Sequence, residues 1–111
     1  MEFKDAVSAR RSEYMLDAAD VDVDAVVSVL RSIAGKVPSS FNAQSARMFV
    51  LSGEDHERFW GIVEDILAER SKDAERFKAT RAKLATFRAA AGTILFYEID
   101  AKTEALMEEH P

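Results

Sequence analysis

Two short apolar runs set the main limit on what this chain can fold into. Residues 48–51 and 93–97 are the segments that we expect to be β-strands, and the second is rich in β-branched and aromatic residues. Two strands by themselves leave both edges of a sheet unpaired, and such a sheet is marginally stable in isolation. We therefore expect an α+β fold with a small sheet that is incomplete without further strands.

Helical patterns surround the two runs. Apolar residues recur at intervals of three and four in the segments that we expect to be helices: 2–11, 23–34, 54–70, 73–91 and 101–109. Asp22 and Ser71 are placed to cap the second and fourth of these helices, and Gly35 and Gly92 to stop them. We expect His56 to be a helix-surface residue. The aromatic residues expected in the core are Phe59, Trp60, Phe77, Phe87 and Phe96.

The size and composition of the chain exclude several classes of function. With 111 residues there is room for one domain, 1–111. The net charge of −5 is spread along the chain without a polybasic block, so we expect no binding to nucleic acid. The absence of cysteine excludes disulfides and thiolate metal sites and fits a cytoplasmic protein. No apolar run approaches the ~20 residues of a membrane span, so we expect no membrane association. His56 and His110, far apart in sequence, provide no metal motif.

A cluster of basic and hydroxyl side chains follows the first expected helix. Arg10, Arg11 and Ser12 stand together and could bind a phosphate through charge-assisted, bidentate hydrogen bonds. The alternative is that the two arginines favour the carboxyl end of a helix through the macrodipole and otherwise lie in water. The residues alone leave both interpretations open.

The loop at residues 37–45 is the least ordinary part of the sequence, because a proline there precedes several hydroxyl and amide groups. Its polar members are Ser39, Ser40, Asn42 and Gln44, and Pro38 fixes the backbone before them. Such a surface suits a flat heteroaromatic ring with polar edges. The alternative is a capped turn leading into a short helix near Phe41.

Taken together, these segments resemble the start of the nitroreductase family. The resemblance is carried by residues 3–7, the cluster at 10–12, the loop at 38–45 and the run at 48–51, in the family's order and spacing. Residues 87–98 are similar to a branch of that family whose members are named only as oxidoreductases. The resemblance covers almost the whole chain and implies a nitroreductase-like α+β fold with helices on a small antiparallel sheet.

The resemblance also implies a cofactor and the residues that bind it. Arg10, Arg11 and Ser12 would contact the phosphate and ribityl chain of FMN from one subunit of a homodimer. The loop of the partner subunit would reach the same flavin through Pro38, Ser39, Ser40 and Asn42, with Gln44 shaping the loop. Tyr14 stands where family members commonly place a basic residue near the pyrimidine edge of the flavin, and it offers a hydroxyl instead.

The function implied is an FMN-dependent oxidoreductase, in which NAD(P)H reduces the flavin and the flavin reduces a nitroaromatic, quinone or similar small acceptor. No side chain is expected to act as nucleophile or general base, because the cofactor carries the chemistry. The family runs to roughly twice this length, so we expect the chain to be an amino-terminal half whose reading frame continues past Pro111. The alternatives are a non-catalytic fragment that binds no flavin and a small helical interaction module.

Overall fold

The computed structural model describes residues 1–110, and Pro111 lies outside the described residues. The elements in chain order are α1 (Phe3–Ala9), α2 (Val23–Ala34), a 3₁₀ turn (Ser40–Asn42), β1 (Ala46–Ser52), α3 (Gly53–Arg70), α4 (Ala74–Arg88), β2 (Gly92–Glu98) and α5 (Asp100–Glu109). The α+β class predicted from the sequence is confirmed. Every predicted helix and strand forms, with ends that differ from the prediction by at most three residues.

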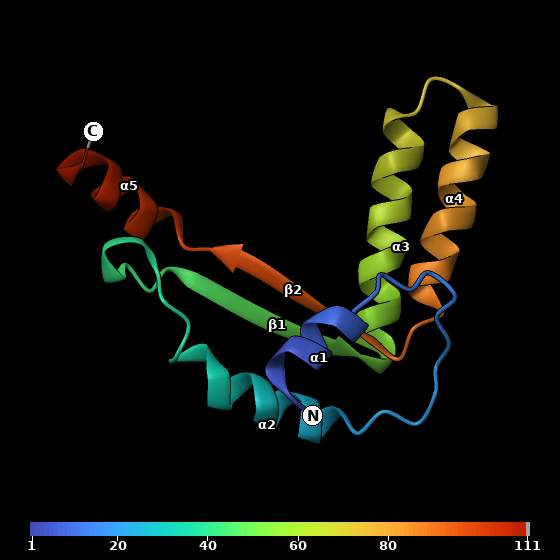
Figure 1. Ribbon diagram of the computed structural model, residues 1–111. Coiled ribbons are helices and arrows are strands. Elements are labelled where there is room, and N and C mark those ends of the chain that lie inside the picture. Colours follow the sequence, from blue (N-terminus) through green and yellow to red (C-terminus); the bar gives the residue numbers. More distant parts are fainter. Residues whose placement is uncertain (111) are drawn as a thin grey trace.

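The two strands form an antiparallel hairpin whose long connection is the α3–α4 helix pair. The register runs from Ala46 opposite Glu98 to Ser52 opposite Gly92. Gly53 has a φ of 56°, a left-handed conformation that glycine adopts without strain, so the chain passes directly from β1 into α3. The α3–α4 pair therefore stands at one end of the sheet and α5 at the other (Figure 1).

Each face of the sheet carries apolar side chains that are only partly covered. On one face Phe49 stacks on Tyr97, with ring centroids 5.2 Å apart. On the other face α2 lies alongside Val50 and Ile94, with a cavity of ≈ 270 Å³ between helix and strands. Phe96, on this second face, is 70% exposed, so its assignment to the core was wrong. Strand alternation places its side chain on the same face as Ile94, where it stays largely open to solvent.

The buried interior of residues 1–110 is very small. Leu84 of α4 is the one buried apolar side chain there, at 8% exposure. The accessible surface is 9384 Å², compared with about 6,100 Å² for a compact monomer of this mass. The radius of gyration is 17.8 Å, compared with about 13 Å for a compact domain of about 100 residues. The elements form correctly but do not enclose a core by themselves.

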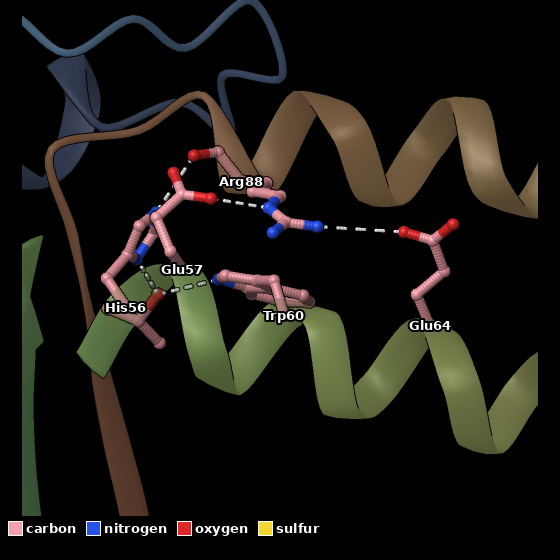
Figure 2. Close-up of polar contacts among 6 residues, drawn as sticks. His56, Glu57, Trp60, Glu64 and Arg88 are labelled. Atoms are coloured by element: carbon pink, nitrogen blue, oxygen red, sulfur yellow. Dashed lines mark hydrogen bonds and ion pairs between the residues drawn. The ribbon is translucent and has the colours of Figure 1, made fainter. Parts of the chain in front are cut away.

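His56 is the second buried residue, at 3% exposure, so its prediction as a helix-surface residue was wrong. It lies in the first turns of α3, where the sheet and the end of α4 meet (Figure 2). Its ring nitrogens lie 2.9 Å from the hydroxyl of Thr93 and 2.9 Å from the carbonyl oxygen of Arg88. These partners are more than thirty positions away, which is why the pattern around His56 did not indicate burial.

The amino terminus of α4 is capped by Asp73 and not by Ser71, which corrects the predicted cap. The carboxylate of Asp73 accepts hydrogen bonds from the backbone N–H groups of Glu75 and Arg76, at 3.0 and 3.3 Å. Ser71 instead donates its hydroxyl proton to the carbonyl oxygen of Asp73. Asp73 provides the cap because it directly precedes the first helical residue. Asp22 caps α2 as predicted, accepting from the N–H of Ala25.

Removal of the Asp73 cap should weaken the α3–α4 pair. We expect Asp73→Ala to lower the free energy of unfolding by about 1 kcal/mol, because two amide groups lose their acceptor. Asp73→Asn is the matched control, since the amide oxygen accepts the same bonds, and it should stay within about 0.5 kcal/mol of the native chain. Urea unfolding followed by circular dichroism measures both. Equal losses for the two variants would contradict the assigned cap.

No helix among residues 1–110 has the combination of length and apolar character that crossing a bilayer requires.

Candidate functional site

The loop at 37–45 has a strained backbone that the sequence did not predict. Phe41, Asn42 and Gln44 have φ values of 50°, 53° and 51°. Asparagine adopts the left-handed region more readily than most residues, but a phenylalanine there is unusual. Backbone strain of this kind costs about 1–3 kcal/mol per residue and gathers at binding sites. The short helix expected near Phe41 is present as the 3₁₀ turn at Ser40–Asn42.

Hydrogen bonds inside the loop fix its shape and leave other polar groups at the surface. The Oγ of Ser39 accepts from the backbone N–H of Gln44 at 3.0 Å. The side-chain amide of Gln44 donates to Oδ1 of Asn42 at 3.1 Å. Ser40 and Asn42 are both exposed. The loop therefore presents a hydroxyl and an amide group on a backbone that its own bonds hold in place.

The loop contacts the carboxyl end of β2 through hydrogen bonds and the end of α5 through ring stacking. The backbone N–H of Ile99 donates to the carbonyl oxygen of Ser45 at 3.0 Å, and the hydroxyl of Ser45 donates to the carboxylate of Glu98. Phe41 stacks on His110 with ring centroids 3.8 Å apart and planes 9° apart. The end of β2 and α5 thus support the loop from one side.

A groove of ≈ 510 Å³ runs beside the loop and contains two cations that sequence analysis missed. Pro38, Ser39, Asn42 and Gln44 line it together with Arg47 of β1 and Lys102 of α5, among others. The guanidinium of Arg47 donates to the carbonyl oxygens of Gln44 and Ala46, at 2.7 and 2.9 Å. Lys102 is brought there by the register that pairs Ala46 with Glu98. Pairing the two predicted strands as a hairpin was the signal that could have found it.

The basic cluster at the end of α1 has two differently placed arginines. Arg10 is the first residue after the helix and, like Ser12, is exposed. Nη1 of Arg11 donates to the carbonyl oxygens of Ser8 and Arg10, at 2.9 and 2.8 Å. Part of Arg11 therefore satisfies the end of the helix, as the macrodipole interpretation expects. Arg10 keeps its guanidinium at the surface.

Tyr14 lies against α4, on the opposite side of the molecule from the loop. Its ring is 6.2 Å from that of Phe87, and the ammonium of Lys83 lies 5.5 Å from its ring centroid. Figure 1 shows the chain after α1 passing beside α3 and α4, whereas the loop lies beside α5. The structure therefore does not bring the basic cluster and the loop together within one chain.

Charged side chains on α3 and α4 form a separate network that joins the two helices. Arg88 donates to Glu57 at 2.5 Å and lies 3.8 Å from Glu64, which also pairs with Arg81 at 2.8 Å. The hydrogen bond to Glu57 is the largest cause that raises the pKa of Arg88 above its ordinary value. These ion pairs are partly exposed, so they contribute modestly to the packing of α3 against α4. Within residues 1–110 no group of three or more metal-ligating side chains gathers.

This architecture, with an antiparallel hairpin, an inserted helix pair and a strained polar loop, is that of the nitroreductases. CinD from Lactococcus lactis superimposes with a TM-score of 0.78 at 28% identity, over 98% of this chain and 54% of that chain. A nitroreductase from Saccharomyces cerevisiae gives a TM-score of 0.75 at 27% identity, over 98% of this chain and 59% of that chain.

The sequence pattern of the nitroreductase family matches residues 7–110, so the chain belongs to that family. HBN1 of Saccharomyces cerevisiae, assigned to the nitroreductases, is 27% identical over 95% of this chain and 52% of its own length. Nitroreductase FRM2 of the same yeast is 26% identical over 98% of this chain and 54% of its own length. The chain spans about half the length of the relatives that it matches. The family resemblance found in the sequence is confirmed.

Proposed function

We propose that the chain forms part of an FMN-dependent NAD(P)H oxidoreductase of the nitroreductase type, with each flavin held between two protomers. The observation that carries this proposal is the separation of two polar segments in a nitroreductase fold. Tyr14, two residues after the basic cluster, lies against Phe87 of α4, whereas Phe41 of the loop stacks on His110 at the end of α5 (Figure 1). A flavin bound by both segments needs a second copy of the chain, so the proposal commits to a homodimer.

The residues present fit such a ligand. Arg10 and Ser12 supply an exposed guanidinium and a hydroxyl for the phosphate, and Arg11 adds positive charge behind them. In the partner's loop, Ser40 and Asn42 offer polar groups at a backbone that is already strained into shape. When bound, FMN would accept hydride from a nicotinamide cofactor and pass electrons to the acceptor. The chain's own residues would bind and orient it.

The exposed surface supports association. Each chain exposes about 3,000 Å² more than a compact monomer would, so two chains together expose about 6,000 Å² more, which is enough for an obligate interface. Part of this surface is apolar, with Phe49, Phe96 and Val29 each more than half exposed. A dimer partner and the further strands expected for the family would cover such surface.

The acceptor class is proposed from the solved relatives. Structures of CinD contain chloramphenicol, nicotinic acid or 4-nitrophenol, so that protein binds small aromatic molecules. By analogy we propose a nitroaromatic, quinone or similar small acceptor for this chain. We place the protein in the cytoplasm, since a chain without cysteine suits a reducing compartment.

Titration of the chain with FMN, followed by quenching of flavin fluorescence, tests the proposal. We expect saturation at about one FMN per protomer and a dimer in analytical ultracentrifugation. Arg10→Ala should weaken FMN binding about tenfold, because a charge-assisted bond to the phosphate is lost. Arg31→Ala, which removes an exposed arginine from α2, is the matched control and should leave the affinity unchanged.

A chain that takes up no FMN would reject the flavoprotein function for this polypeptide. The result would favour the second candidate, a non-catalytic interaction module, for which the exposed apolar residues are the supporting observation. Equal affinity in the Arg10→Ala variant would leave flavin binding in place but remove Arg10 from the phosphate site.

A further inference from the structure

The side chains of Trp60, Thr93 and His56 form a relay of hydrogen bonds at the root of the α3–α4 pair, with His56 buried and the other two partly buried. Nε1 of Trp60 lies 2.9 Å from Oγ1 of Thr93, which lies 2.9 Å from Nδ1 of His56. Nε2 of His56 lies 2.9 Å from the carbonyl oxygen of Arg88. The relay therefore ties the start of α3, the end of α4 and the start of β2 to one another (Figure 2).

The chemistry of the partners selects one of the two neutral tautomers of His56. The carbonyl of Arg88 can only accept, so Nε2 of His56 must carry a proton and donate it. The indole of Trp60 can only donate, so Thr93 accepts from it. The hydroxyl proton of Thr93 is then free to go to Nδ1 of His56. One neutral tautomer of His56, protonated at Nε2, satisfies all three groups.

A line of aromatic contacts leads from the relay to Tyr14, two residues after the basic cluster. The ring of Trp60 lies 5.3 Å from that of Phe87, and Phe87 lies 6.2 Å from Tyr14. Tyr14 follows Arg10 and Ser12 by a few residues in a segment without regular secondary structure. Such a segment has no backbone ladder of its own, so its place depends on what its side chains touch. Phe87 and Lys83 of α4 are those contacts.

We propose that His56, as the neutral Nε2–H tautomer, is a positioning residue that sets the end of α4 so that Phe87 holds the Tyr14 segment, and with it Arg10, at the flavin site. Two carboxylates, Glu54 and Glu57, line the cavity beside His56, and Glu57 accepts from the guanidinium of Arg88. Asp17, from the segment after Tyr14, lines the cavity beside Thr93. The flavin part of this inference rests on the proposed function.

Two matched pairs of variants separate positioning from simple loss of stability. Thr93→Val keeps the shape of the side chain and removes the hydroxyl, whereas Thr93→Ser keeps the hydroxyl. His56→Ala removes the ring, whereas His56→Gln keeps one donor and one acceptor. We expect Thr93→Val and His56→Ala to weaken FMN binding about tenfold, and Thr93→Ser and His56→Gln to stay within about threefold of the native chain. FMN affinities are compared only among variants whose circular dichroism shows native helix content.

Two measurements test the relay without FMN. Long-range ¹H–¹⁵N spectra should show the Nε2–H tautomer for His56. Cross-relaxation between the rings of Tyr14 and Phe87 should be present in the native chain and in Thr93→Ser, and lost in Thr93→Val. A native chain that binds no FMN but passes both tests would reject the proposed function and retain the positioning role. An Nδ1–H tautomer, or Tyr14–Phe87 contacts that survive in Thr93→Val, would overturn the inference.

Discussion

Replacement of Leu84 by alanine is expected to lower the free energy of unfolding by about 2–5 kcal/mol. Leu84 lies on α4, which packs against α3, and is 8% exposed. Truncation removes its apolar contacts and leaves a cavity that the surrounding helices fill only in part. Urea unfolding followed by the emission of Trp60, the single tryptophan, measures the loss directly. An interior this small makes the expected loss a large share of the total stability.

Leu67→Ala is the matched control for this prediction. Leu67 belongs to α3, undergoes the same chemical change, and is 36% exposed. Its truncation should cost about 1 kcal/mol or less, because much of the removed surface was already in water. Similar losses for the two variants would show that Leu84 is not the packing centre of the helix pair.

Local patterns were sufficient to predict the elements of this fold. Asp22 caps α2 because the cap depends on one side chain and the amide groups of the next turn. The helix α2 begins at Val23 and ends at Ala34, as the apolar spacing and Gly35 predicted. Such features are settled within a few residues of sequence. The error at Ser71 is of the same local kind, because two polar residues two positions apart competed for one cap.

Burial was not predictable from the same patterns, because it depends on which distant segments meet. His56 becomes buried when Thr93 and the end of α4 come against it, and neither is near it in sequence. Phe96 has strong strand and core character, yet its side chain stays largely open to solvent. Hydrophobicity predicts which side chains favour burial. Whether they become buried depends on the size of the folded unit and on which segments pack over them.

The candidate site was predicted in outline and not in geometry. Proline, serine and asparagine in the loop indicated a polar turn, but not the left-handed backbone at Phe41. The positions of Arg47 and Lys102 beside the loop depend on the register of the two strands, and the sequence analysis did not predict this register. The prediction of flavin binding came from the family resemblance. Arginines at a helix end can equally serve to bond the last carbonyl groups of the helix, as Arg11 does.

Alanine at Gly92 is expected to destabilise the chain by up to about 3 kcal/mol and to disturb the His56 relay at the same time. A Cβ at this position would lie 2.7 Å from the carbonyl oxygen of Leu51, a backbone atom that can move only with its strand. Gly92 pairs with Ser52 at the end of the sheet and directly precedes Thr93. Separation of the strands there should break the bond from Trp60 to Thr93, which a red shift of Trp60 emission would report.

Gly35→Ala distinguishes this clash from the general effect of replacing glycine. Gly35 ends α2 with a φ of −78°, and a Cβ there would meet nothing within 4 Å. The substitution reduces the freedom of the unfolded chain and should raise the free energy of unfolding by about 0.4–1 kcal/mol. The two variants should therefore change stability in opposite directions. Stabilisation of the chain by Gly92→Ala would show that Gly92 and Leu51 do not approach each other closely. Unchanged Trp60 emission in the same variant would show that the relay does not depend on this approach.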